Sequence, residues 1–144
     1  MDYAKYYLAL DTLIELNIEN QKEKARMKLE LSSALWAETV CTVRCNIGRC
    51  TGATSYIMER AKPGDLIVTH ANWMSNNFRK FINPQCDISS AEELEKNSIF
   101  KHYNTVWVDD PDLVFARIKP QKFYELLADS EGQVFVLLGS LRPY

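Results

Sequence analysis

Four short apolar runs in the last two thirds of the chain constrain its fold more than any other sequence feature. Each run is rich in β-branched residues and carries no charged side chain, which is typical of strands buried on both faces. The runs are Val40–Val43, Leu66–Val68, Thr105–Val108 and Val134–Leu138. Helix-like segments lie between and around them, at residues 54–61, 72–82, 90–97 and 120–128. This alternation predicts an α/β fold, a three-layer sandwich with a mainly parallel four-stranded sheet.

The first 38 residues have a different pattern, which predicts two helices. Residues 2–17 place apolar side chains three and four positions apart, as an amphipathic helix does. A second helix is expected over residues 20–38, where a charged run supplies a solvated face. We therefore expect an N-terminal helical extension at residues 1–38 and an α/β core at residues 39–144, in one compact domain. Ser89 and Glu92 have the spacing of a capping box for the helix expected at residues 90–97.

Composition narrows the classes of partner. The chain has 144 residues and a formal net charge of −2, with basic and acidic residues interspersed. It therefore has no global field that would attract nucleic acid or an anionic membrane. No stretch approaches the roughly 20 apolar residues that span a bilayer. The N-terminus lacks a cationic start followed by an apolar core, so we expect no secretory signal and a cytoplasmic location.

A glycine-rich segment at residues 46–55 lies between the first predicted strand and the helix that follows it. In this context, glycines allow successive backbone N–H groups to point at a phosphate, and the helix N-terminus adds positive potential. A lysine and a hydroxyl complete such a phosphate-binding loop, the hydroxyl as a Mg²⁺ ligand. Here Gly52 and Thr54 occupy the positions of the last glycine and the hydroxyl, whereas Ala53 occupies the position of the lysine.

Polar side chains also follow the last two predicted strands. Asp109 and Asp110 come directly after one strand, and Ser140 follows the other. The carboxyl ends of parallel strands meet at one edge of the sheet, where ligands of open α/β folds bind. The sequence thus places two carboxylates and a hydroxyl at the same edge as the glycine-rich segment.

These motifs together resemble the helicase and phage-terminase branch of P-loop NTPases. Gly48–Thr54 resembles its first motif, Asp65–Asn72 its second strand and following loop, Val106–Asp110 its Walker B strand, and Leu138–Ser140 its coupling motif. The resemblance covers about residues 40–143. It implies a sheet in which the first of the four strands lies beside the fourth, then the third, with the second at the edge.

The resemblance also implies a set of site residues. The nucleotide would contact Gly48, Arg49, Thr51, Gly52, Thr54, Ser55 and Ser140. Mg²⁺ would be bound by Asp109 and Thr54, and Asp110 would orient the attacking water if the protein is active. Mg²⁺ and ATP are accordingly the expected cofactors, weakly bound. A source in a phage or another mobile element is implied by the resemblance to terminases.

Two departures from the family pattern bear on activity. The lysine is replaced by Ala53, and the first glycine of the strict spacing is replaced by Ile47, with Gly48 beside it. Losing the lysine removes a charge-assisted contact of roughly 1.5–3 kcal/mol in the ground state, and more where charge develops during transfer. We therefore expect hydrolysis to be very slow or absent.

Simpler interpretations of the same residues remain open. Gly48–Thr54 also fits a plain strand-to-helix turn, and Asp109 and Asp110 precede a proline, as in many turns. Cys41, Cys45 and Cys50 lack the paired Cys-x-x-Cys spacing of a zinc site, so buried thiols are expected instead. The aromatic residues of segment 72–82 fit either packing on the sheet or stacking on single-stranded nucleic acid.

Three functional hypotheses follow from the sequence. The first is a degenerate P-loop protein that acts through a protein partner or a homo-oligomer. The second is a residual NTPase in which another cation replaces the lysine, namely Arg44, Arg49 or a neighbouring subunit's Arg142. The third is a nucleic-acid-binding accessory protein that uses Arg79, Lys80, Lys101 and His102, although the near-neutral charge disfavours tight nonspecific binding.

Overall fold

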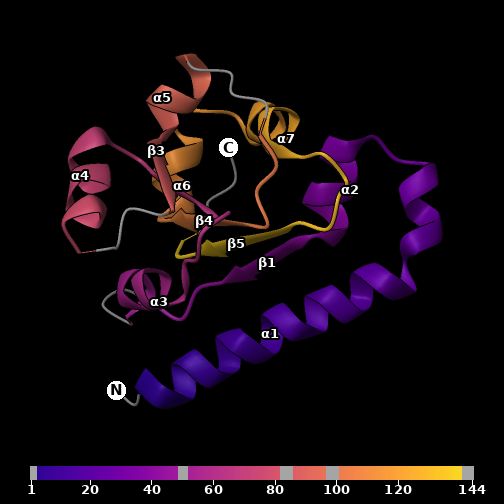
Figure 1. Ribbon diagram of the computed structural model, residues 1–144, viewed down its shortest axis with the longest axis horizontal. Helices are drawn as coiled ribbons and strands as arrows, with labels where there is room; N and C mark the ends of the chain where they lie inside the picture. Colours follow the sequence, from indigo (N-terminus) through magenta and orange to yellow (C-terminus); the bar gives the residue numbers. More distant parts are fainter. Residues whose placement is uncertain (1–2, 49–51, 82–85, 97–100, 141–144) are drawn as a thin grey trace.

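The computed structural model describes residues 3–48, 52–81, 86–96 and 101–140. Their central feature is a five-stranded, all-parallel sheet with the strand order β1-β5-β4-β2-β3 (Figure 1). The strands are β1 (Thr42–Cys45), β2 (Leu66–Thr69), β3 (Asp87–Ser90), β4 (Thr105–Asp109) and β5 (Val134–Leu138). Strands β2 and β5 are buried at every position, as their continuous apolar sequences predict.

The fold class is therefore α/β as predicted, but the sheet has five strands and not four. The four predicted strands correspond to β1, β2, β4 and β5, and they lie in the expected order of first, fourth, third and second. The second strand is not the edge, because β3 pairs with it from Leu66↔Asp87 to Thr69↔Ser90. Strand β1 also begins two residues later than predicted, because Val40 still belongs to the preceding helix.

Strand β3 was missed because its sequence, Asp-Ile-Ser-Ser, has no apolar run. Backbone pairing forms it instead, beginning with the N–H of Asp87, which donates to the carbonyl of Asp65 at 3.2 Å. The predicted capping box is wrong for the same reason, since Ser89 lies within this strand. The hydroxyl of the next residue, Ser90, accepts a hydrogen bond from the N–H of Glu93 at 3.2 Å.

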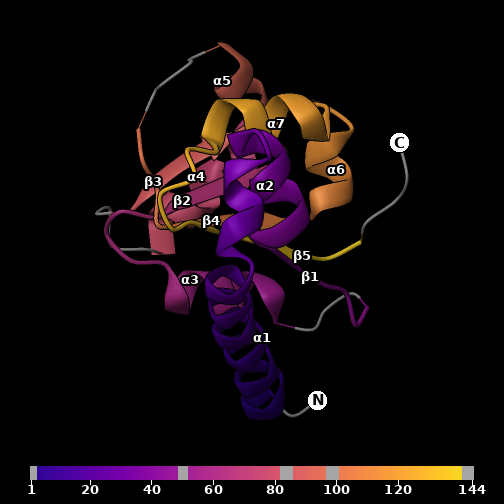
Figure 2. The same ribbon diagram turned by 90° about the vertical axis from the view of Figure 1, so that its right-hand side faces the viewer.

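Helices cover both faces of the sheet (Figure 2). They are α1 (Tyr3–Glu23), α2 (Ser33–Val40), α3 (Ala53–Arg60), α4 (Asn72–Phe81), α5 (Ala91–Lys96), α6 (Pro111–Phe115) and α7 (Pro120–Leu127). One face packs against α2, α5, α6 and α7, and the other against α1, α3 and α4. None of the helices in the described ranges combines the length and the apolar character that crossing a bilayer requires.

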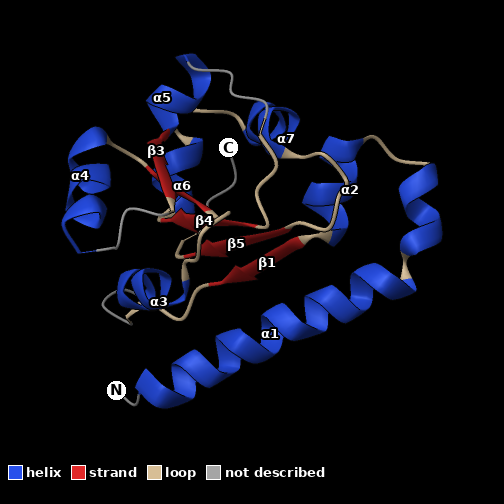
Figure 3. Cartoon of the chain, in the orientation of Figure 1, coloured by secondary structure: helices blue, strands red, loops and turns tan. Residues whose placement is uncertain are grey.

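The N-terminal helices differ from the prediction in their boundaries. Helix α1 continues to Glu23, so it includes the start of the helix expected at residues 20–38 (Figure 3). A short 3₁₀ helix, η1 (Ala25–Leu29), follows, and α2 begins after Ser32. The Ser32 hydroxyl accepts a hydrogen bond from the N–H of Leu35 at 3.2 Å, which satisfies a donor at the start of α2.

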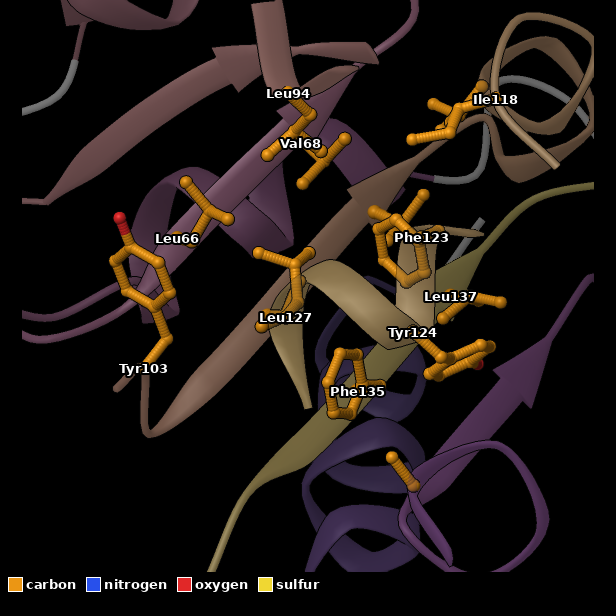
Figure 4. Packing of buried hydrophobic residues seen from close by; sticks show 14 of the residues in the cluster. Leu66, Val68, Leu94, Tyr103, Ile118, Phe123, Tyr124, Leu127, Phe135 and Leu137 are labelled. Atoms are coloured by element: carbon orange, nitrogen blue, oxygen red, sulfur yellow. The ribbon is translucent and has the colours of Figure 1, made fainter. Parts of the chain in front are cut away.

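Two hydrophobic clusters, one on each face, hold the layers together. The larger contains aromatic rings from α6, α7 and β5, and Phe123 meets Phe135 edge-to-face at 5.9 Å between centroids (Figure 4). The smaller is centred on Tyr56, Ile67 and Trp107. Helix α1 contributes Tyr6 and Leu10 to this second cluster. The first helix of the chain is thereby fixed under β1 and β5, and its N-terminal end lies toward α3.

Candidate functional site

A cleft of about 710 Å³ lies at the edge of the sheet where β1, β4 and β5 end. Four parts of the chain line it: the start of α1, the glycine-rich loop with the start of α3, the end of β4 with α6, and the end of β5. Parallel strands place their carboxyl ends at one edge, so the topology brings these parts together. The lining residues include Gly48, Gly52, Thr54, Ser55, Asp109, Asp110 and Ser140.

Seven of the predicted site residues thus border one cavity, although they come from three separate regions of the sequence. Two further predicted nucleotide contacts, Arg49 and Thr51, lie outside the described residues, as does the proposed substitute cation Arg142. Another proposed substitute, Arg44, does not line the cleft. Its guanidinium donates to the carbonyl of Glu38 at 3.2 Å.

The glycines of the loop have backbone angles that favour glycine. Gly48 has φ of 109° and Gly52 has φ of 87°, both in the left-handed region. The Gly48 N–H donates to the side-chain oxygen of Asn46 at 3.0 Å. Gly52 caps α3, and its carbonyl accepts from the N–H of Tyr56 at 2.8 Å. The loop therefore ends in a turn that leads directly into the helix N-terminus.

A tyrosine from the first helix packs against this turn. A Cβ atom added at Gly52 would lie 2.5 Å from two ring atoms of Tyr3, so the ring occupies the space beside the glycine. Tyr3 remains 49% exposed and lines the cleft together with the buried Tyr6. The sequence pattern does not place either tyrosine in the site. Only their clustering near the N-terminus was a signal, and it does not indicate where the helix packs.

An ionic and aromatic network attaches α1 to α3. The Asp11 carboxylate accepts from the Tyr56 hydroxyl at 2.6 Å and from Arg60 Nε and Nη2, both at 3.1 Å. The Arg60 guanidinium also lies over the rings of Tyr7 and Tyr56. The hydrogen bond from Arg60 is the main reason why the pKa of Asp11 is lowered. This network holds the N-terminal end of α1 against the helix that follows the loop.

The Thr54 hydroxyl, in the first turn of α3, contacts the carboxylate of Asp109, the last residue of β4. Thr54 Oγ1 lies 3.1 Å from Oδ2 and 3.3 Å from Oδ1 of Asp109, and donates to this carboxylate. Asp109 is only 3% exposed. Burial and, secondly, the neighbouring Asp110 raise the pKa of Asp109 to about 7, while the hydrogen bond from Thr54 opposes the shift. The carboxylate is thus costly to ionise in this protein without a nearby cation.

The backbone of Asp110 links the end of β4 to helix α6 beside the cleft. Asp110 has φ of 53° and ψ of 67°, and its carbonyl accepts from the N–H groups of Leu113 and Val114, which starts α6. The end of β5 passes close to it, since a Cβ atom added at Gly139 would lie 3.4 Å from Asp110 Cα. The carbonyl of Ser140 accepts from the N–H of Asp112 at 2.9 Å. Asp112 lies in helix α6, which the sequence pattern does not predict, and its carboxylate is the third to line the cleft.

Among the described residues, the charged side chains that line the cleft are all acidic. Three carboxylates line it, from Asp109, Asp110 and Asp112, and no lysine, arginine or histidine within the described ranges does so. Ala53 lines the cleft at the position where the resemblance expects lysine. A polyanion in this cavity would therefore lie close to negative charge.

The candidate nucleic-acid residues lie elsewhere. In α4, Phe78 packs into the core as an amphipathic helix requires, whereas Trp73 is 61% exposed and Phe81 is 73% exposed. Arg79 donates to the carbonyl of Ile88 at 3.0 Å. Two more of the candidate cations have acidic partners: Lys101 pairs with Asp87 at 2.9 Å, and His102 with Asp129 at 2.7 Å.

In the described ranges, one group of three residues has side chains of the kinds that bind metal ions. His102, Asp129 and Glu131 offer ligand atoms that lie within 4.8 Å of one another. They precede β4 and β5, so they lie at the opposite edge of the sheet from the cleft. Cys41 is a buried free thiol, as expected, whereas Cys45 is only partly buried and Cys50 lies outside the described residues. Cys86 is also a buried free thiol, and burial raises the pKa of Cys41 and of Cys86 to about 12.

A comparison with protein-family models gave no match to this chain, and a comparison with curated proteins gave none either.

Proposed function

We propose that this protein is a degenerate P-loop NTPase-like domain, encoded by a phage or another mobile element, that hydrolyses nucleotide weakly or not at all. It acts by binding a protein partner or as an accessory subunit. The observation that carries the proposal is the hydrogen bond between Thr54 and Asp109 at the carboxyl edge of the sheet. These two residues are 55 positions apart, and the resemblance assigns them to one metal site.

The strand order supports the same proposal. In the sheet, β1 lies beside β5, then β4, then β2, which is the order that the resemblance implies and that strand–helix alternation alone does not. The left-handed conformation of Gly52 at the start of α3 agrees with a loop whose backbone faces an anion. Ala53 argues against efficient catalysis, because its methyl group offers no charge to the outer phosphates.

The residues present fit a Mg²⁺ ion in their chemistry. Thr54 and Asp109 offer the hydroxyl and carboxylate oxygens that Mg²⁺ prefers, and the buried Asp109 carboxylate has no cationic partner among the described residues. Mg²⁺, when bound, would offset the charge of a triphosphate. Asp110 would act on water only if the protein retains activity.

The residual-NTPase alternative requires a cation that replaces the lysine. The pairing of Thr54 with Asp109 favours it, because a Mg²⁺ site has its known use beside a triphosphate. Arg44 does not line the cleft, so this alternative rests on Arg49 or on a neighbouring subunit's Arg142.

The nucleic-acid alternative has one observation in its favour. Trp73 and Phe81 are both exposed on α4, a helix that carries Lys80 and no acidic residue. Aromatic rings beside cations bind single strands by stacking and by phosphate contacts. Oligonucleotide binding that weakens steeply with salt, and weakens further in Trp73→Ala, would support this alternative over the first proposal.

The exposed apolar residues of α1 support a role in partner binding. Leu8, Leu13 and Leu16 of this helix are 66%, 39% and 53% exposed. Exposed apolar residues that gather on one surface are typical of protein interaction sites.

The test is a calorimetric titration of ATP, ADP and GTP with Mg²⁺ into the wild type, Ala53→Lys and the uncharged control Ala53→Met. We expect weak or undetectable triphosphate binding by the wild type and the control. Ala53→Lys should gain at least about tenfold in affinity, the equivalent of 1.4 kcal/mol from a new charge-assisted contact. If Ala53→Lys gains nothing, the loop is only a turn and the proposal is wrong. Micromolar binding by the wild type would instead favour the residual-NTPase alternative.

A further inference from the structure

We infer that the cleft takes a purine nucleoside, bound by stacking on Tyr3, and that added phosphates weaken the binding. The inference rests on the proposed function, because it assumes that the cleft is derived from a nucleotide site. It differs from that function in assigning the affinity to the base rather than to the phosphates. An active P-loop has the opposite preference, because its lysine contacts the outer phosphates.

The position of Tyr3 is the first argument. Its ring packs over Gly52 at the start of α3, lines the cleft and remains 49% exposed, so one part of the side chain is fixed while another part is available. An exposed aromatic ring at the edge of a cavity offers a face on which a base can stack. A purine has a larger face than a pyrimidine, so it gains more from the contact.

The support beneath Tyr3 is the second argument. Tyr6 and Leu10, which follow on the same helix, are buried against the sheet, with exposures of 7% and 0%. The Asp11 carboxylate is bound by Tyr56 and Arg60 of α3, which fixes α1 relative to the loop. A ring on a helix held in this way loses little freedom when a ligand stacks on it.

The charge of the cleft is the third argument. Asp109, Asp110 and Asp112 line it, and within the described ranges no basic side chain does. Each phosphate added to a nucleoside brings negative charge toward this group of acidic side chains, of which Asp110 is the one that is partly exposed at the cleft and not deeply buried. A neutral nucleoside avoids that repulsion and can still use the polar groups of the loop.

The size of the cleft agrees with this ligand class. Its volume of about 710 Å³ lies within the roughly 300–1,000 Å³ range of small-molecule sites. A second cavity, of about 310 Å³, lies between α1 and α3, and Tyr3 lines both cavities.

The experiment is a calorimetric titration of adenosine, AMP, ADP and ATP into the wild type, in EDTA at low salt. We expect affinity to fall from adenosine to ATP. Raising the salt concentration should recover part of the ATP affinity and leave adenosine unchanged, because screening weakens only the charge repulsion. Tighter binding of ATP than of adenosine by the wild type would overturn the inference, and would show that a cation such as Arg49 acts in the cleft.

Variants of Tyr3 test the stacking contact. Tyr3→Ala should weaken adenosine binding about tenfold or more, and Tyr3→Phe should keep it, since the ring and not the hydroxyl makes the contact. Glu19→Ala is the control, because Glu19 is exposed on the same helix and does not line the cleft. Equal adenosine affinity in the wild type and Tyr3→Ala would contradict the inference.

Ala53→Lys separates the two proposals. If this variant gains ATP binding while the wild type does not bind adenosine, the proposed function holds and the inference is wrong. If the wild type binds adenosine through Tyr3 and Ala53→Lys gains no ATP binding, the cleft is a nucleoside site without a phosphate loop. Absence of binding to every probe by both proteins would overturn both proposals.

Discussion

At the scale of single residues, Gly52 carries two constraints that can be separated. Its φ of 87° favours glycine, and the ring of Tyr3 fills the space that a side chain would need. Gly48 carries only the first constraint, because no atom of the described residues, its chain neighbours apart, lies within 4 Å of where its Cβ would be. Gly48 can therefore serve as the control position for substitutions at Gly52.

We predict that Gly52→Ala lowers the free energy of unfolding by about 2 kcal/mol or more, from the left-handed backbone and the contact with Tyr3. Adding Tyr3→Ala should recover the share of this loss that comes from the contact with Tyr3 and leave the share that comes from the backbone conformation. Gly48→Ala should lose only the backbone part and should not respond to Tyr3→Ala. Denaturant titrations of the wild type, the three single variants and the two double variants measure this, and a Tyr3→Ala response at Gly48 equal to that at Gly52 would contradict the packing described.

Asp109 is the second residue whose environment can be tested directly. Its folded-state pKa, about 7, lies above the reference value of 3.8, so between these values the folded protein holds a proton that the unfolded chain has lost. The contribution of Asp109 to stability therefore falls as the pH rises from about 4 to about 7 and does not change further above that range. The cause is mainly burial, with repulsion from Asp110 as the second contribution.

We predict that Asp109→Asn stabilises the protein at pH 8 by a few kcal/mol, because it replaces a buried charged side chain with a neutral one of nearly the same shape. Near pH 4 the variant and the wild type should have similar stability, since Asp109 is then protonated. Denaturant titrations across this range compare the two proteins. A stability difference that does not change with pH would mean that Asp109 ionises freely in the folded protein.

At the scale of elements, α1 is the helix on which the candidate site depends most. Two of its residues enter the core beneath the sheet, and its first turn lines the cleft. Its ion pair with α3 is about one third exposed at both side chains, so the pair contributes little stability and mainly sets the position of the helix. Burial of Leu10 should provide more of the energy that holds α1 in place.

We predict that Leu10→Ala destabilises the protein by roughly 2–5 kcal/mol, because Leu10 is fully buried and its loss leaves a cavity. Leu8→Ala, at a 66% exposed position on the same helix, should change stability by no more than about 0.5 kcal/mol. Both are measured by denaturant unfolding. Similar small effects at the two positions would show that α1 does not pack on the sheet as described.

At the scale of the whole molecule, one buried acid joins separate parts of the sheet. The Asp65 carboxylate accepts from the N–H groups of Lys62 and Thr105 and from the indole N–H of Trp107, at 3.0–3.2 Å. Its backbone carbonyl accepts from the N–H of Asp87, at the start of β3. A residue just before β2 thus connects β4 and the edge strand.

We predict that Asp65→Ala lowers the free energy of unfolding by about 3 kcal/mol or more, because it leaves one buried and two partly buried donors without an acceptor. Asp65→Asn, which keeps one acceptor oxygen, should cost less. Glu19→Ala, on the exposed surface of α1, is the control and should be nearly neutral. Denaturant unfolding followed by tryptophan fluorescence is suitable because Trp107 contacts Asp65, and a neutral Asp65→Ala would contradict this role.

The sequence by itself determined the four main strands and most of the helices of the core. Strands buried on both faces must be apolar at successive positions, so β2, β4 and β5 are visible as continuous runs. The sequence also determined which residues reach the carboxyl edge, because Thr54, Asp109 and Ser140 directly follow strands or begin a helix. These features depend on neighbours in the chain, which a single sequence contains.

Only the tertiary structure decided the remaining features, because they depend on contacts between distant residues. Strand β3 forms from the polar sequence Asp87–Ser90 because β2 offers it an open edge with backbone partners. Helix α1 continues to Glu23, packs under β1 and β5, and brings Tyr3 to Gly52, 49 positions away in the chain. No local pattern encodes that approach. Packing therefore decided that the cleft combines an aromatic ring with three carboxylates, the combination on which the ligand inference rests.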